Sequence, residues 1–177
     1  LVSDWSSDVC SSDLTTYEPV VGGSEVEAVR VCAALRERGW DVEVLCQAAP
    51  GLEGDPARLD SRGTPVHEYG GRLPVRLRAF AHAAGAAWRI WRRRECGVVY
   101  FLMTGIQLAT ALPMAAMTGK RILMKFSGSN TIEPLTRSAL GRLELRMISN
   151  WSQAILVLNA GMAEEALSAG LPQQRQI

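Results

Sequence analysis

The sequence contains little that would support a metal centre, a disulfide framework or a membrane span. It has two histidines and four cysteines, and the cysteines lie too far apart for a C-x-x-C pair. This spacing argues against a structural metal site and favours a reducing compartment. The longest apolar stretch, residues 106–117, is interrupted by Gln107, Thr110 and Pro113 and is too short to cross a bilayer. We therefore expect a cytoplasmic domain with no bound metal or cofactor.

Motifs of several common enzyme classes are also absent. No G-x-G-x-x-G marks a dinucleotide site, which disfavours an oxidoreductase, and no Asp-x-Asp triplet points to a metal-bound donor. The two histidines, His67 and His82, are isolated, and we interpret both as structural or surface residues. The formal net charge is only +1, which gives no whole-chain signal for nucleic acid.

What the chain does have is the composition of one globular α/β domain. Its 177 residues are 47% hydrophobic and 21% charged, values typical of a soluble domain with a real core. A domain of this length buries roughly 70% of its unfolded surface, so it needs no disulfide or metal to fold.

Residues 4–14 stand apart from this pattern. The run DWSSDVCSSDL has no hydrophobic period, and it matches in one frame the translation of a sequencing-library adapter. We therefore interpret residues 1–14 as a non-native leader and residues 15–177 as the domain. On this interpretation residues 1–14 lie outside the core, and the first strand of the sheet is missing or replaced.

From Thr15 onward, strand and helix signals alternate. Ser24 and Glu27 form an S-x-x-E capping box at the start of a helix that Gly39 ends. Short strands separated by helices predict right-handed crossovers, and so a parallel, Rossmann-like sheet with helices on both faces. The further strands are expected at 42–46, 65–69, 98–102, 121–126 and 154–158, and the further helices at 73–94, 104–118, 134–150 and 159–170.

A Gly-Gly pair precedes the first helix. Gly22 and Gly23 let the backbone approach a ligand, and the helix N-terminus that follows presents free N–H groups suited to a phosphate or diphosphate. Glu25 lies in the first turn of that helix. The alternative is a tight turn without a ligand, because a Gly-Gly pair alone is a weak signal.

Polar residues also follow the later strands, where ligands bind in open parallel sheets. These positions offer hydroxyls, amides and flexible backbone for hydrogen bonds to sugar hydroxyls or phosphate, although ordinary polar loops would look the same. Lys125 could reach this edge, but a single lysine on a strand more often lies at an edge or on the surface. The candidate substrate-binding residues are Gly22, Gly23, Glu25, Thr104, Ser127, Gly128, Ser129, Asn130 and Asn159.

The helix at 73–94 is rich in arginine and carries Ala81, Trp88 and Trp91 near one face. A basic amphipathic helix can lie on an anionic membrane surface. It is therefore a candidate for peripheral contact with the inner face of the membrane, and the alternative is a solvated face.

Four runs in order resemble family-4 glycosyltransferases of the GT-B type. YEPVVGGSEVEAVRVCAALRERGWDVEVLC at 17–46 resembles the start of their N-terminal domain, with Trp40 where His is usual. GVVYFLMT and KRILMKFSGSN resemble the fourth and fifth strands, and ELRMISNWSQAILVLNAGMAEEALSAG resembles the segment before the interdomain linker. The chain departs from the family pattern with Ser127-Gly128 in place of His-Gly and Asn159 in place of Ser.

The resemblance implies the acceptor-side, N-terminal half of an enzyme that moves a sugar from a nucleotide-diphosphate donor to a hydroxyl acceptor. The acceptor would be a glycan, a lipid-linked molecule or a small molecule, as in polysaccharide biosynthesis. Residues 171–177 stand where the linker to a donor-binding domain would begin, so we expect no turnover from this chain alone. The alternative from another class is a non-catalytic nucleotide- or phosphate-binding module.

Overall fold

The computed structural model describes residues 8–14, 17, 23–48, 57–126, 128 and 131–177. The strands are β1 (Asp8–Leu14), β2 (Asp41–Gln47), β3 (Arg58–Leu59), β4 (Pro65–Tyr69), β5 (Val98–Phe101), β6 (Arg121–Lys125) and β7 (Ala154–Leu156). The helices are α1 (Gly23–Glu37), α2 (Val75–Arg92), α3 (Ile106–Met117), α4 (Glu133–Arg137), α5 (Ala139–Trp151) and α6 (Ala160–Ser168), followed by a 3-10 turn, η1 (Gln173–Arg175).

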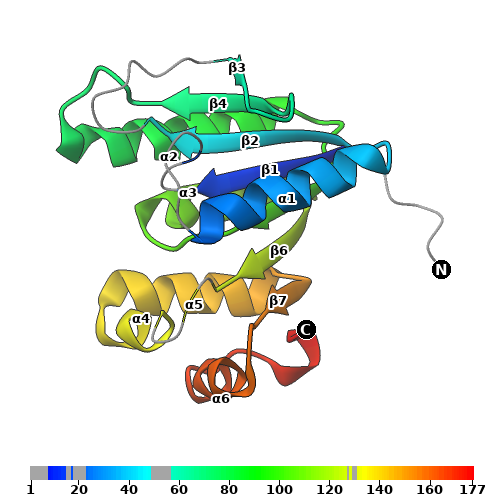
Figure 1. Cartoon of the computed structure of the whole chain (residues 1–177). Helices are drawn as coiled ribbons and strands as arrows, with labels where there is room; N and C mark the ends of the chain where they lie inside the picture. Colours follow the sequence, from blue (N-terminus) through cyan, green and yellow to red (C-terminus); the bar gives the residue numbers. More distant parts are fainter. Residues whose placement is uncertain (1–7, 15–16, 18–22, 49–56, 127, 129–130) are drawn as a thin grey trace.

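The strands form one seven-stranded sheet in the order β3-β4-β2-β1-β5-β6-β7. All neighbouring pairs are parallel except the short β3, which pairs antiparallel with β4. Helices connect most of the parallel strands, as Figure 1 shows. The prediction of an α/β, Rossmann-like parallel sheet with helices on both faces is confirmed.

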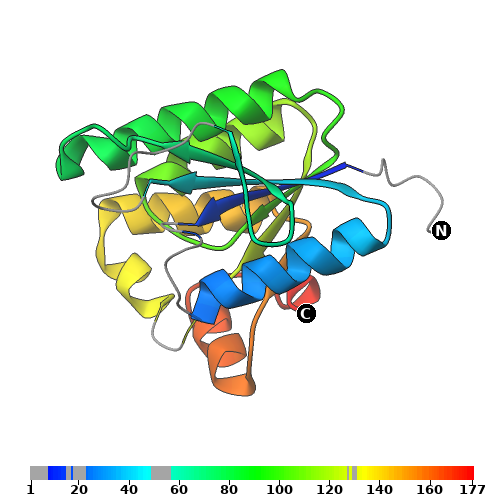
Figure 2. The ribbon, with the colours of Figure 1, turned by 45° about the horizontal axis from the view of Figure 1, so that its top comes forward.

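The two faces of the sheet are covered differently. Helices α2, α3 and α5 pack side by side on one face, and α1 lies on the opposite face over β1 and β2. Helix α6 lies at the β7 end of the sheet (Figures 1 and 2). The larger core cluster lies under α2, α3 and α5 and includes the fully buried Phe101, Leu112 and Ile148. A smaller cluster under α1 includes Val44 and Val98.

Strand β1 corrects one expectation. We expected residues 1–14 to lie outside the core and the first strand to be missing or replaced, yet Asp8–Leu14 forms a central strand that pairs with both β2 and β5. A parallel ladder is built from backbone N–H and C=O groups, so a segment without apolar periodicity can still form it when its neighbours present two open strands. The first strand is therefore present in this segment, and whether residues 1–14 are a non-native leader stays a prediction.

Local details of the helices differ from the sequence pattern. Ser24 and Glu27 do not form the expected capping box, because α1 already begins at Gly23 and Glu27 pairs with Lys125. The helix expected at 134–150 is two helices, separated at Ser138, whose hydroxyl accepts a hydrogen bond from the Gly141 N–H (2.9 Å).

Two further expectations concern the cysteines and the possible membrane spans. Cys32 and Cys46 are free and buried. Across the parts of the chain that the structure describes, no helix combines the length and the apolar character that a membrane span requires.

Candidate functional site

The described candidate residues gather at the carboxyl edge of the parallel sheet. Gly23 and Glu25 begin the helix after β1, Thr104 follows β5, Gly128 follows β6 and Asn159 follows β7. In an open parallel sheet, this edge is where ligands bind. The remaining candidates, Gly22, Ser127, Ser129 and Asn130, lie outside the described residues.

The start of α1 is open to close approach. A methyl group built on Gly23 would meet no atom within 4 Å, so the backbone at the helix N-terminus is not covered by described residues. Glu25 does not point away from the helix start, because its carboxylate accepts a hydrogen bond from the Ser24 hydroxyl (3.0 Å). A carboxylate in the first turn is favoured by the helix dipole.

Lys125 is buried, although the sequence suggested a position at an edge or on the surface. It is the last residue of β6, its side chain is only 2% exposed, and its ammonium pairs with the Glu27 carboxylate of α1. A buried charge is tolerated when a close partner compensates the lost hydration. The pair therefore places a positive charge at the β6 exit and ties that exit to the first turns of α1.

Glu144 is a residue that the sequence analysis missed. Although it lies on α5, its side chain is buried and its carboxylate accepts a hydrogen bond from the Gly105 N–H (3.0 Å) at the exit of β5. Gly105 has φ +113°, a conformation that side chains rarely adopt. Burial raises the pKa of Glu144, and the hydrogen bond from Gly105 opposes that rise.

The exit of β6 is held in a similar way from α6. Glu165 accepts hydrogen bonds from the backbone N–H groups of Ile132 (3.1 Å) and Glu133 (2.6 Å). Thr131 donates its hydroxyl to the Gly128 carbonyl (2.7 Å). The contacts with Glu165 fix Ile132 and Glu133 against α6.

Asn159 serves as the N-cap of α6, as the sequence predicts. Its side-chain oxygen accepts a hydrogen bond from the Met162 N–H (2.9 Å). That oxygen is thus engaged in the cap, and the amide nitrogen is the part of the side chain left to meet a ligand.

Carboxylates from helices distant in sequence therefore organise two strand exits, those of β5 and β6. Glu27 meets the end of β6, Glu144 meets the exit of β5, and Glu165 meets the start of α4. These contacts use the N–H groups of Gly105, Ile132 and Glu133, so they fix the backbone at the strand exits and leave ligand binding to other groups there. Within the described ranges, no cluster of three or more His, Cys, Asp or Glu side chains could hold a metal ion.

A charged cluster at the opposite end of β2 is structural. Glu43 is buried and pairs with Arg89 (2.6 Å), with His67 Nε2 at 3.3 Å. Burial alone would raise the pKa of Glu43, but hydrogen bonds from His67 and Arg89 and the charges of Arg89 and Arg93 lower it to about 2. The cluster joins β2 and β4 to the end of α2 and lies away from the carboxyl edge.

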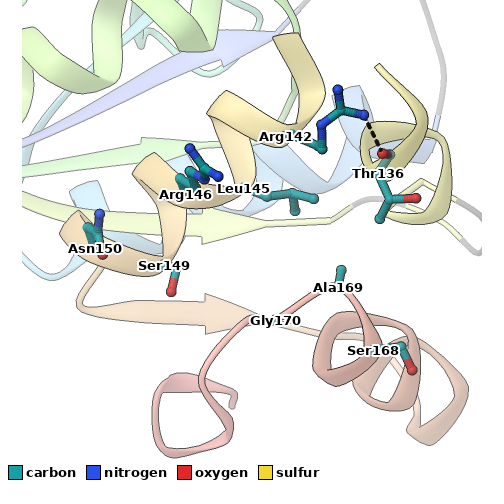
Figure 3. Close-up of a pocket in the computed structure, with 9 residues that line it drawn as sticks. All are labelled: Thr136, Arg142, Leu145, Arg146, Ser149, Asn150, Ser168, Ala169 and Gly170. Atoms are coloured by element: carbon teal, nitrogen blue, oxygen red, sulfur yellow. Dashed lines mark hydrogen bonds between the residues drawn. The ribbon is translucent and has the colours of Figure 1, made fainter. Parts of the chain in front are cut away.

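One open pocket does not coincide with the candidate residues. It has a volume of about 460 Å³ and lies between α5 and α6 (Figure 3). Arg142 on its rim turns toward Thr136, whose carbonyl accepts a hydrogen bond from the guanidinium (3.2 Å). Most of the lining side chains are exposed, so the pocket is a shallow hollow between two helices.

A second pocket touches the ion pair at the β6 exit. It measures about 270 Å³ and runs along the sheet face beside α1. Glu27 is its one charged lining residue, and the others are apolar or aromatic. The lining residues are Glu27, Val31, Leu35, Trp40, Val98, Tyr100, Leu123 and Leu156.

Solved structures share this fold. HepE (Alr3699) from Anabaena, in complex with UDP-glucose, matches with a TM-score of 0.64 and 13% identity over 96% of this chain and 42% of its own. The UDP-GlcNAc 2-epimerase from Methanocaldococcus jannaschii matches with a TM-score of 0.57 and 8% identity over 96% of this chain and 44% of its own. The chain thus spans less than half the length of these proteins.

Sequence comparison identifies the family. No curated protein matches the chain. The model of Glycosyltransferase Family 4 matches residues 21–176, which is most of the sequence and includes every described candidate residue. This match agrees with the ordered runs of family-like sequence and with the Rossmann-like sheet. The chain belongs to glycosyltransferase family 4.

Proposed function

We propose that this chain is the acceptor-side domain of a glycosyltransferase that moves a sugar from a nucleotide-diphosphate donor to a hydroxyl acceptor. The observation that carries the proposal is the carboxyl edge, where carboxylates from other helices hold the strand exits at Gly105 and the buried Lys125, and where Gly23 begins the helix after β1. The reaction class in the proposal, sugar transfer, comes from the family to which the chain belongs.

The arrangement suits charge stabilisation at a diphosphate better than covalent catalysis. A helix N-terminus and an ammonium group both stabilise negative charge that develops on a leaving phosphate. The Lys125 ammonium is paired with the Glu27 carboxylate. Its stabilisation of a phosphate charge is therefore smaller than that of an unpaired lysine. The polar exits at Thr104 and Asn159 are left for the acceptor.

One solved structure of the same fold guides the choice of donor to test. HepE binds UDP-glucose, and UDP-sugars are therefore the first donors to test. Transfer requires donor and acceptor held together, and this chain offers one wall of the cleft. We expect millimolar or weaker donor binding, about −4 kcal/mol, and no transfer by the chain alone.

Calorimetry on the chain and a transfer assay on the longer parent polypeptide test the proposal. The parent should transfer a sugar, and Gly23→Val should lower kcat/KM by blocking close backbone approach. Glu37→Val, at an exposed position at the other end of α1, is the control and should leave transfer unchanged. Micromolar donor binding by this chain alone would contradict the proposal, because the donor would then bind mainly to this domain and not to the other half of the parent enzyme.

The second candidate function is a nucleotide- or phosphate-binding module without catalysis. The helix N-terminus at Gly23 favours it, because that feature binds phosphate in many folds. A parent polypeptide that binds the nucleotide but transfers no sugar to any hydroxyl acceptor would support this candidate instead.

A further inference from the structure

Helix α2 exposes most of its large apolar residues to solvent and buries mainly alanines. A surface helix usually turns its large apolar residues toward the core. Helix α2 instead packs on the sheet and α3 through alanines together with His82 and Ile90, and it turns aromatic residues to solvent. The inner residues Ala83, Ala86 and Ile90 are 3%, 0% and 0% exposed. The outer residues Leu77, Phe80, Trp88 and Trp91 are 50%, 56%, 56% and 43% exposed.

The outer residues form one continuous stripe, the α2 stripe, defined as Leu77, Phe80, Ala84, Trp88 and Trp91. Their steps of three and four residues keep them on one side of a helix. Trp88 and Trp91 contact each other, with ring centroids 4.9 Å apart. The helix is about 27 Å long and lies along the outside of the molecule, at the top of Figure 2.

The charge on helix α2 itself has one sign, and the acidic side chains next to its end, Glu95 and Asp41, pair with Arg93. Residues 72–94 contain seven arginines and no acidic residue, although the whole chain has a net charge of only +1. Arg89 and Arg93 pair inward with Glu43. Arg92 and Arg94 are exposed, and the Arg92 guanidinium lies 5.8 Å from the Trp88 ring centroid. Exposed cations therefore border the aromatic end of the stripe.

We propose that the α2 stripe docks on the surface of an anionic lipid bilayer. An aromatic and aliphatic stripe buries into the boundary between headgroups and acyl chains, while arginines beside it meet lipid phosphates. The helix lies flat in this arrangement, in the plane of the interface. The proposal does not depend on the sugar-transfer function, because it rests on α2 alone.

A second copy of the chain fits the stripe less well. An isologous dimer through α2 would bring two arginine-rich helices together, and α2 offers no acidic side chain to pair with them. A bilayer with anionic lipids supplies the negative charge that a second copy lacks. Charge complementarity therefore selects the lipid surface.

Vesicle binding by the full 177-residue chain tests the proposal. The chain should sediment with vesicles that contain phosphatidylglycerol in phosphatidylcholine, and more weakly with phosphatidylcholine alone. Replacing Trp88 and Trp91 together by Ser should lower the partition coefficient about tenfold or more, from the lost apolar contact. Replacing Arg92 and Arg94 together by Gln should lower it about tenfold on the anionic vesicles and much less on the neutral ones.

The matched control changes exposed apolar residues elsewhere. Met117 is 81% exposed and Leu167 is 43% exposed, and their joint replacement by Ser should leave the partition coefficient unchanged. Circular dichroism of each variant checks that the fold is intact. The proposal is overturned if the unsubstituted 177-residue chain does not bind vesicles, or if the Trp88/Trp91 variant binds them as strongly as the unsubstituted chain does. Concentration-dependent dimerisation lost in the Trp88/Trp91 variant, without vesicle binding, assigns the stripe to a second copy instead.

Discussion

On one face of the sheet, α2, α3 and α5 lie side by side over a continuous core, whereas α1 leaves an apolar pocket open beside β5, β6 and β7 on the other. The difference is visible in β6 itself. Ile122 and Met124 are fully buried beneath the three helices, but Leu123, which points to the other face, is only half-buried. Adjacent residues of one strand therefore meet different degrees of packing, and their contributions to stability should differ accordingly.

The largest expected effect compares two leucines across the sheet. Leu112 of α3 is fully buried, and Leu112→Ala should lower the free energy of unfolding by about 2–5 kcal/mol because it leaves a cavity in a packed core. Leu123→Ala in the apolar pocket should lower it by about 1 kcal/mol, since that side chain is already in partial contact with solvent. Urea denaturation measures both values. Equal losses would show that the pocket face is as tightly packed as the other.

The next effect concerns Glu43, on the covered face. Its pKa in the folded chain is about 2, against 4.5 for the free group, so its carboxylate stabilises the fold above pH 4.5 and that stabilisation is lost as pH falls toward 2. The amount is about 3 kcal/mol. Glu43→Gln should remove this dependence in denaturation curves taken across that window.

The control for Glu43 is Asp41, which pairs with Arg93 (2.9 Å) but is 60% exposed. Asp41→Asn should change the free energy of unfolding by less than about 0.5 kcal/mol, because exposed ion pairs contribute little. A pH dependence between 4.5 and 2 that survives Glu43→Gln unchanged would assign the acid sensitivity to other carboxylates.

The smallest expected effect compares two helical glycines. A methyl group on Gly85 of α2 would lie 2.3 Å from the Tyr69 ring, so Gly85→Ala should destabilise the chain by about 1–3 kcal/mol. On Gly161 of α6 the nearest atom would be Asn159 Oδ1 at 3.4 Å, and Gly161→Ala should be neutral or stabilising by up to about 1 kcal/mol. Thermal melts of the two variants give the order. A neutral Gly85→Ala would mean that Tyr69 moves aside freely.

The sequence predicted the alternation of elements well, because that alternation is written in local patterns. The apolar run Val98–Phe101 and the strand Arg121–Lys125 both form close to their expected bounds. The Asn159 cap is also confirmed, since capping depends on residues only three apart. Fold class and family followed from these local signals and their order.

What could not be predicted depends on contacts between distant residues. Glu144 reaches Gly105, and Glu165 reaches Ile132, across more than thirty residues of sequence. Nothing local marks either glutamate as an organiser of a strand exit. Lys125 was misplaced for the same reason, because its burial depends on Glu27 of another helix. The roles of the candidate site residues in binding stay a prediction.

Strand β1 has a consequence for how this chain meets other copies of itself. It fills the slot between β2 and β5 and precedes α1 in the sequence. If β1 leaves that slot, the sheet presents two facing rows of unpaired N–H and C=O groups, which is a template for any extended segment of suitable length. Reciprocal exchange of β1 between two molecules would satisfy both slots with native pairing. This exchange needs no covalent link between the two molecules. A free peptide with the sequence of β1 would compete with it for the slot between β2 and β5.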